Sequence, residues 1–536
     1  MTEGMLEVRA LAVAIGNRPV VSEVNFTLPR GQTLAIIGES GSGKSMTAAA
    51  IMGLLPAGLR LASHSEVLLG GKPLPLRDES LMRRIRGRRM AMIFQDPMSC
   101  LNPYMTVGAQ IAEALRHLGV RRGAEQRERI VELLRLVELP TPEVMVRRYP
   151  HQMSGGQQQR VMIAMALASE PELLIADEPT SALDATVQAE VLQLLERVQQ
   201  RLHTSILFIT HDLAAAARLA HDIVVLQSGR VVEQGPVGQV IHAPRQAYTK
   251  LLVSVRQMLE RPQAGHDRPS ERPVLVIRDL SYAYPARGPL KKSNKVLDGI
   301  SLPLHGGRTL GILGESGSGK STLALIVAGL ISPDMGEIEL FGDSMAAVRF
   351  RMSPRQRRRC QIVFQNPYGA LNPRLTIEQT MREPIELLET PGRTGLRSRL
   401  EQSLADVGLE PGHLNRYPHQ LSGGQRQRVC IARALLSGPE LLICDEIVSA
   451  LDATVQMQVL ETVRSLQRRL GFAMLFIGHD IEIVRWVSDD IAVMHRGRVV
   501  ELGNAEQIVQ APAHSYTRRL IASAPALARA SVNPGA

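Results

Sequence analysis

An identical octapeptide that occurs twice is the feature that most constrains this chain. GESGSGKS stands at residues 38–45 and again at 314–321, which is 276 residues later. Other paired segments follow in the same order in both places: IFQDP with VFQNP, MSGGQ with LSGGQ, and LLIADE with LLICDE. Solenoid repeats have periods of only about 20 to 50 residues. The chain is therefore predicted to be a tandem duplication with one large domain in each half.

The join between the halves is predicted from composition. The segment from Arg256 to Pro273, RQMLERPQAGHDRPSERP, holds three prolines, a glycine, mixed charges and few apolar residues. This composition is typical of an extended linker. We predict a first domain over residues 1–255, a linker over 256–272 and a second domain over 273–536.

Several protein classes are disfavoured by composition. No apolar run approaches the roughly 18 residues that cross a bilayer, and the N-terminus lacks the pattern of a signal peptide. The four cysteines, Cys100, Cys360, Cys430 and Cys444, have neither metal-ligand nor disulfide spacing, which favours a reduced cytosolic protein. The formal charge is +10, but an aromatic content of 3% argues against base stacking. The arginine clusters at 83–89 and 355–359 are interpreted as solvated faces or as structural neighbours of a phosphate site.

A phosphate-binding loop is predicted in each half. A short apolar strand, TLAIIG or TLGILG, leads directly into Gly-x-x-x-x-Gly-Lys-Ser. Glycines let successive backbone N–H groups face one anion, and the following helix contributes its positive end. The lysines would reach the β- and γ-phosphates of a nucleotide, and the last serines would place a hydroxyl on Mg²⁺. The predicted loop residues are Gly38, Ser40, Gly41, Gly43, Lys44, Ser45, Gly314, Ser316, Gly317, Gly319, Lys320 and Ser321.

Each half also contains an apolar run, LLIAD or LLICD, that ends in two carboxylates. A continuous apolar run fits a parallel strand that is buried on both faces. Asp177 and Asp445 are predicted to hold Mg²⁺, while Glu178 and Glu446 would act as general base or orient the attacking water. Such a pair can also mark a strand that simply enters a solvated loop. Its position downstream of a phosphate loop favours the catalytic interpretation.

Three further motifs carry a family resemblance. SGGQ opens a helix-like stretch in each half, SALD follows the acidic pair, and His-Asp follows another apolar strand. With the loops above, these motifs resemble the ABC ATPase family over nearly the whole chain, twice. The resemblance implies an α/β fold of two tandem P-loop ATPase domains. Each would have a RecA-like core, a helical signature subdomain and a small antiparallel β subdomain.

The resemblance also implies the composition of two sites for ATP and Mg²⁺. The halves would pack head to tail, so that each site joins one half's phosphate loop to the other half's signature. Site one would combine Lys44, Ser45, Gln95, Asp177, Glu178 and His211 with Ser422, Gly423 and Gly424. Site two would combine Lys320, Ser321, Gln365, Asp445, Glu446 and His479 with Ser154, Gly155 and Gly156. The histidines would sense the γ-phosphate, and the glutamines would contact Mg²⁺ and couple the site to a membrane subunit.

The chain departs from the family pattern at a few positions. An aromatic residue usually precedes the phosphate loop and stacks on adenine; Tyr284 stands there in the second half, but Ile15 in the first. The second half reads DEIVSALD where DEPTSALD is usual, although Glu446 is retained. We therefore predict two hydrolysing sites of unequal affinity, with the weaker one on the first phosphate loop.

Local features narrow the resemblance further. Leu-Asn-Pro follows each glutamine motif, and APRQAYTKLL and APAHSYTRRL stand near the two domain ends. The combination resembles the oligopeptide, dipeptide and nickel importer subfamily, including fused members that handle glutathione or modified peptides. That subfamily implies two integral-membrane permease subunits, an extracytoplasmic solute-binding protein and a place at the cytoplasmic face of the inner membrane. Neither nucleic acid nor a second copy of the chain is expected as a partner.

A tandem ABC ATPase of translation or DNA repair is the alternative. Translation factors of this type carry a longer, heavily charged arm between their domains, and the repair enzymes insert zinc-binding cysteines. The short linker, the four scattered cysteines and the two Tyr-Thr segments favour the importer. The solute itself is not identified, because the ATPase never contacts it.

Overall fold

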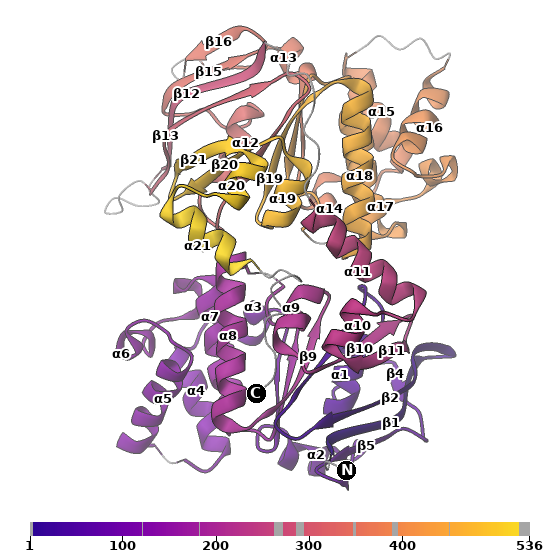
Figure 1. Ribbon diagram of the computed structural model, residues 1–536, viewed down its shortest axis with the longest axis vertical. Coiled ribbons are helices and arrows are strands. Elements are labelled where there is room, and N and C mark those ends of the chain that lie inside the picture. The colour runs from indigo at the N-terminus through magenta and orange to yellow at the C-terminus, as the bar shows by residue number, and fades with distance from the viewer. Residues whose placement is uncertain are drawn as a thin grey trace. The chain divides into compact units, whose positions relative to one another are not determined.

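The computed structural model describes residues 4–120, 122–181, 183–261, 272–285, 294–346, 350–388, 395–449 and 451–524. The chain forms two compact units whose boundary falls between Gln257 and Met258 (Figure 1). Helix α11, Ala247–Glu260, extends into the predicted linker, so residues 256–260 are helical rather than extended. Residues 262–271 of the linker lie outside the described residues. The exact domain limits stay a prediction.

The first unit is built around a six-stranded sheet. Its strand order is β11-β10-β3-β9-β8-β7, with parallel pairing except at the antiparallel edge strand β11. The apolar runs before the phosphate loop and before the acidic pair form β3 and β8, in which every residue is buried. This sheet contains β3 Thr33–Ile37, β7 Met90–Ile93, β8 Leu173–Asp177, β9 Ser205–Thr210, β10 Asp222–Gln227 and β11 Arg230–Pro236.

A second, antiparallel sheet packs its apolar side chains into a core shared with the first sheet. Its strands are β1 Gly4–Ile15, β2 Arg18–Pro29, β4 Leu59–Leu61, β5 Glu66–Leu69 and β6 Lys72–Pro73. Helix α1, Lys44–Met52, buries Ile51 in this core and begins directly after the phosphate loop. The small antiparallel β subdomain implied by the family resemblance is therefore present.

The helices of the first unit include a separate group that carries the signature (Figure 1). Gln110 of this group is buried and holds the Leu-Asn-Pro turn through the backbone of Asn102. The signature helix α7 packs against α4 and α5 in a core that includes Ile111, Leu134 and Val161. The helices are α2 Glu79–Ile85, α3 Pro97–Cys100, α4 Val107–His117, α5 Ala124–Leu136, α6 Pro142–Met145, α7 Gly155–Leu167, α8 Ala185–Leu202, α9 Leu213–Leu219 and α10 Val237–His242.

The second unit repeats this architecture. Its six-stranded sheet has the order β17-β18-β19-β14-β20-β21, and its antiparallel sheet the order β13-β12-β15-β16. The strands are β12 Pro273–Tyr284, β13 Asn294–His305, β14 Thr309–Leu313, β15 Met335–Leu340, β16 Asp343–Ala346, β17 Cys360–Val363, β18 Leu441–Asp445, β19 Ala473–Gly478, β20 Asp490–His495 and β21 Arg498–Asn504. The helices are α12 Lys320–Val327, α13 Pro354–Arg359, α14 Pro367–Ala370, α15 Ile377–Leu388, α16 Leu396–Asp406, α17 Gly423–Leu435, α18 Ala453–Leu470, α19 Ile481–Val487, α20 Ala505–Gln510 and α21 Ser515–Ser523.

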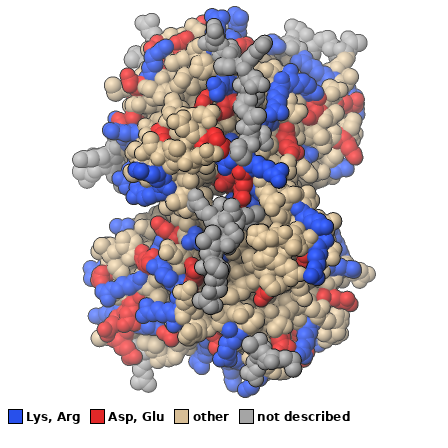
Figure 2. Space-filling model, viewed as in Figure 1, with Lys and Arg blue, Asp and Glu red and all other residues tan. Residues whose placement is uncertain are grey.

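The basic residues do not form one continuous patch on the face that Figure 2 shows, because acidic side chains lie among them. Members of the two arginine clusters have structural partners. Arg89 Nε donates to Glu172 Oε1 at 2.6 Å, and the guanidinium of Arg359 lies 4.0 Å from the ring centre of Phe341. Over the described ranges, none of the helices has the length and apolar content needed to cross a membrane.

Candidate active site

The phosphate loops join β3 to α1 and β14 to α12. A side chain at Gly38 would place its Cβ 2.2 Å from the carbonyl oxygen of Leu226, and one at Gly314 would lie 2.3 Å from that of Met494. Gly43 and Gly319, which precede the two helices, have φ angles of 102° and 103°. Only glycine fits these positions without strain. The loop conformation therefore follows from the glycine spacing.

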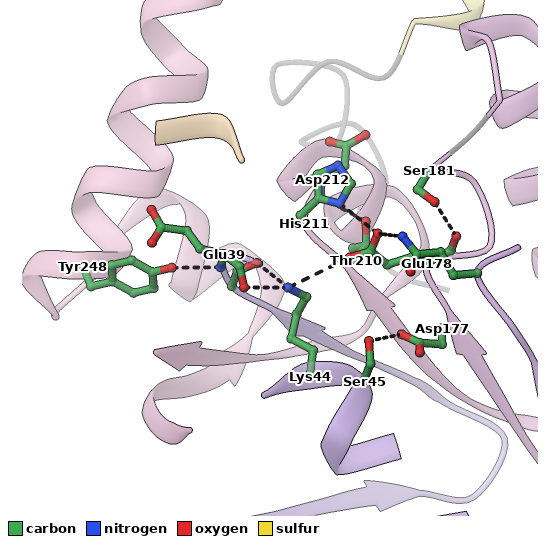
Figure 3. A network of polar contacts seen from close by, with 12 residues as sticks. Glu39, Lys44, Ser45, Asp177, Glu178, Ser181, Thr210, His211, Asp212 and Tyr248 are labelled. Carbon is green, nitrogen blue, oxygen red and sulfur yellow. Dashed lines mark hydrogen bonds and ion pairs between the residues drawn. The ribbon is translucent and has the colours of Figure 1, made fainter. Parts of the chain in front are cut away.

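The lysine of each loop is buried and held by loop carbonyls. Lys44 Nζ donates to the carbonyl oxygens of Gly38 at 2.8 Å and Glu39 at 2.9 Å (Figure 3). Lys320 Nζ makes the same bonds in the second unit, to Gly314 at 2.7 Å and Glu315 at 3.0 Å. Burial lowers the pKa of Lys320. Each ammonium group thus lies inside its loop, at the position where the loop would bind a phosphate.

Serine and aspartate meet at the predicted metal position. Ser45 Oγ donates to Asp177 Oδ1 at 3.0 Å, and Ser321 Oγ donates to Asp445 Oδ1 at 3.1 Å. Burial raises the pKa of each aspartate to about 6. A cation beside these carboxylates would favour their ionised form. Paired hydroxyl and carboxylate oxygens are donors that Mg²⁺ prefers, so these residues fit the ion.

Glutamine, glutamate and histidine form a second cluster in each unit. Glu178 Oε2 accepts from Gln95 Nε2 at 3.1 Å and lies 3.3 Å from His211 Nδ1 (Figure 3 shows the pairing with His211). The bond to Glu178 raises the pKa of His211. Burial opposes ionisation of Glu178, but the bond to His211 together with the charges of His211 and Lys44 outweighs it and lowers the pKa of the glutamate. Gln95 thus contacts the glutamate, and its predicted contact with Mg²⁺ stays a prediction.

The second unit reproduces this cluster. Glu446 Oε2 accepts from Gln365 Nε2 at 2.8 Å and lies 3.3 Å from His479 Nδ1. Both glutamates have left-handed backbone conformations, with φ of 46° at Glu178 and 48° at Glu446. Such a conformation costs a residue with a side chain about 1 to 3 kcal/mol and is common at functional sites. The contacts of both glutamates therefore maintain this backbone conformation and fix the direction of the side chain.

The signature serines and glycines begin α7 and α17. Ser154 Oγ accepts from the N–H of Gln157 at 3.3 Å, and Ser422 Oγ accepts from that of Gln425 at 3.2 Å. A Cβ at Gly155 would meet nothing within 4 Å, but one at Gly156 would lie 2.5 Å from Val187 Cγ1. The first glycine of the pair thus faces open space, while the second allows close packing.

The position of the predicted adenine contact is equivalent in the two units. Ile15 pairs with Arg18 at the end of β1, and Tyr284 pairs with Asn294 at the end of β12. Tyr284 Oη lies 3.4 Å from Oγ1 of Thr322, beside the start of the helix that follows the phosphate loop. Ile15 has 50% of its surface exposed. The two residues occupy the same strand position, and stacking on adenine stays a prediction.

Sequence reasoning assigned no role to two residue pairs that contact the loops. The N–H of Gly229 donates to the carbonyl of Ser42 at 2.9 Å, and Gly497 does the same to Ser318 at 3.1 Å. The hydroxyls of Tyr248 and Tyr516, at the start of α11 and α21, accept from the N–H groups of Glu39 and Glu315. The Tyr-Thr segments pointed to these tyrosines, but only as family markers.

Comparison with known proteins identifies the family. The family model described as "ABC transporter" matches residues 21–181 and 297–449, more than half of the chain. This chain belongs to the ABC transporter family. It is an ATPase of that family with two ABC domains, as the repeated motifs predicted. A second model, "Oligopeptide/dipeptide transporter, C-terminal region", matches residues 232–279 and 500–533, which include both Tyr-Thr segments.

Relatives of this ABC ATPase match it along nearly the whole chain. The peptidoglycan transport ATP-binding protein YejF of Agrobacterium fabrum is 42% identical over 98% of this chain and 97% of its own length. The glutathione import ATP-binding protein GsiA of Escherichia coli K12 is 42% identical over 94% of this chain and 86% of its own. The GsiA protein of Salmonella paratyphi A is 41% identical over the same shares. These transport ATPases favour the importer over the alternative of translation or DNA repair.

Proposed function

We propose that this ABC ATPase drives an importer of peptides or peptide-derived solutes, a class that includes glutathione and peptidoglycan fragments. The observation that carries the proposal is the matched pair of sites. Each unit pairs a loop lysine, a serine–aspartate contact and a Gln–Glu–His cluster in the same geometry. The C-terminal region model and the transport relatives support the peptide class of solute.

The residues of each site have separate roles in hydrolysis. Lys44 would exchange its carbonyl partners for phosphate oxygens, and Ser45 and Asp177 would hold Mg²⁺. When bound, the ion neutralises charge on the β- and γ-phosphates. Glu178, ionised at neutral pH and oriented by His211, would accept a proton from the water that attacks the γ-phosphorus, which releases ADP and phosphate. The second unit would use Lys320, Ser321, Asp445, Glu446 and His479 in the same roles.

We infer that both units hydrolyse ATP. Ile447 and Val448, which depart from the usual family residues after Glu446, are buried, and the glutamate keeps the same contacts as Glu178. The pairing of each phosphate loop with the other half's signature is part of this proposal. This pairing rests on the family resemblance and on the open space that a Cβ at Gly155 would point into.

The membrane partners are proposed from the family and from exposed apolar residues. ATPases of importers act with membrane permeases, and we propose two permease subunits, an extracytoplasmic solute-binding protein and a location at the cytoplasmic face of the inner membrane. Several apolar side chains that follow Gln95 or Gln365 in the sequence are exposed, as expected for a surface that contacts another protein. Met98 and Tyr104 have 60% and 90% of their surface exposed, and Tyr368 of the second unit has 52%. Large exposed apolar side chains after the glutamine of both units fit a surface that docks on another protein.

Reconstitution tests this function. The full-length chain would be copurified with its permease subunits in lipid vesicles, and ATP hydrolysis measured with a panel of peptides, glutathione, peptidoglycan fragments and Ni²⁺, each presented by the binding protein. Stimulation by a peptide-derived solute, abolished in the Lys44→Ala/Lys320→Ala variant, is expected. Stimulation by Ni²⁺ alone, or ATP hydrolysis that no solute in the panel affects, would refute the proposed solute class.

A further inference from the structure

One peptide unit of the first phosphate loop is held at both ends. Its carbonyl, on Gly38, accepts from Lys44 Nζ at 2.8 Å, and its N–H, on Glu39, donates to Tyr248 Oη at 3.1 Å (Figure 3). The carbonyl and the N–H of one peptide share a rigid plane. The tyrosine hydroxyl therefore fixes the direction of the carbonyl group that accepts the hydrogen bond from the lysine.

The second unit contains the same arrangement. Gly314 accepts from Lys320 Nζ at 2.7 Å, and the N–H of Glu315 donates to Tyr516 Oη at 3.3 Å. Tyr516 is buried, and its ring centre lies 4.0 Å from that of His495. The segments around the two tyrosines, APRQAYTKLL and APAHSYTRRL, differ at half of their positions, yet both keep the tyrosine and its contact with the loop.

A glutamate on the neighbouring strand places each tyrosine. The carboxylate of Glu233, in β11, accepts from the N–H groups of Arg245 at 2.8 Å and Gln246 at 3.0 Å, just before α11. In the second unit Glu501 of β21 accepts from Ala513 at 2.7 Å and His514 at 3.0 Å. A carboxylate at the start of a helix is stabilised by the unpaired N–H groups there. The start of each C-terminal helix is thus anchored beside its own phosphate loop.

We propose that Tyr248 and Tyr516 are positioning residues for the phosphate-binding lysines and link nucleotide affinity in each unit to the docking of its C-terminal helix. When ATP draws the lysine away from the loop carbonyl, the tyrosine bond still holds this peptide. Without the hydroxyl, the ATP-bound loop loses that support, so it becomes less stable relative to the nucleotide-free loop, in which the lysine holds the carbonyl. The loss should therefore fall on affinity rather than on turnover at saturating ATP. The inference rests on the proposed binding of MgATP at these loops.

Removal of single hydroxyls tests the proposal in the full-length chain. In a Lys44→Ala background, which silences the first loop, Tyr516→Phe should raise the dissociation constant for MgATP by about 2- to 10-fold in calorimetry, the range of one neutral hydrogen bond. The matched control is Tyr248→Phe in that background, because it removes the hydroxyl from the loop already silenced. In the otherwise unchanged chain, Tyr248→Phe/Tyr516→Phe should raise KM for ATP and preserve kcat. The melting temperature without nucleotide should fall by no more than about 2 to 4 °C, the shift expected from one lost hydrogen bond in a domain of this size.

Each outcome separates this inference from the proposed function. If the Lys44→Ala chain binds no MgATP at all, the proposed function of the second loop fails and the inference fails with it. If that chain binds MgATP and Tyr516→Phe leaves the affinity unchanged, only the inference is overturned. A fall in kcat without a change in KM, or a weaker affinity that accompanies a fall in melting temperature well beyond that of one lost hydrogen bond, would also overturn it, since the tyrosine would then act in turnover or in folding.

Discussion

At the residue scale, Glu178 and Glu446 are the groups on which hydrolysis depends most in this account. Glutamine at both positions keeps the shape of the side chain but cannot accept a proton from water. We expect Glu178→Gln/Glu446→Gln to lower the ATPase rate by at least about 100-fold, the usual contribution of a general base. Binding of MgATP should persist, because the loop lysines and the serine–aspartate pairs are unchanged. A phosphate-release assay with parallel calorimetry checks this, and near-normal turnover would remove both glutamates from the mechanism.

A second residue-scale prediction concerns the unequal adenine positions. If Tyr284 stacks on adenine and Ile15 cannot, the loss of about 1 to 2 kcal/mol weakens the first site about 5- to 30-fold. Ile15→Tyr should then tighten ATP binding in a chain whose second loop is silenced by Lys320→Ala. Ile15→Leu, which adds no ring, is the matched control. Because Ile15 is half exposed at a strand end, neither change should affect folding. Equal gains from tyrosine and leucine would mean that another residue supplies the stacking surface.

At the scale of elements, the start of the signature helix α17 offers a paired test. A Cβ at Gly424 would lie 2.4 Å from Val455 Cγ1, so Gly424→Ala should destabilise the second unit by about 1 to 3 kcal/mol and lower its melting temperature. A Cβ at Gly423 would meet only Leu451 Cδ2, at an ordinary 3.7 Å. Gly423→Ala should therefore fold normally and lose ATPase activity if this glycine faces a nucleotide. The opposite pattern, with Gly423→Ala unfolded and Gly424→Ala fully active, would contradict this role of the helix start.

Elements with a local pattern could be predicted from the sequence, and those fixed by distant contacts could not. The apolar runs that became β3 and β8 are buried along their whole length, as parallel central strands must be. Helix α11 continues past the predicted domain end, because Leu259, within the predicted linker, is buried as Val255 is one turn earlier. The contact of Tyr248 with Glu39 joins residues 209 positions apart. Nothing in either local sequence indicates such a contact.

At the scale of the whole molecule, we propose that one chain contains two complete ATP sites. The test uses Glu178→Gln/Glu446→Gln, which should hold ATP without consuming it. Calorimetric titration with MgATP would give the number of nucleotides bound per chain, and light scattering of the same sample would give its mass. We expect two ATP molecules bound to a particle of one chain. A single ATP per chain, or an ATP-dependent dimer of chains, would contradict it.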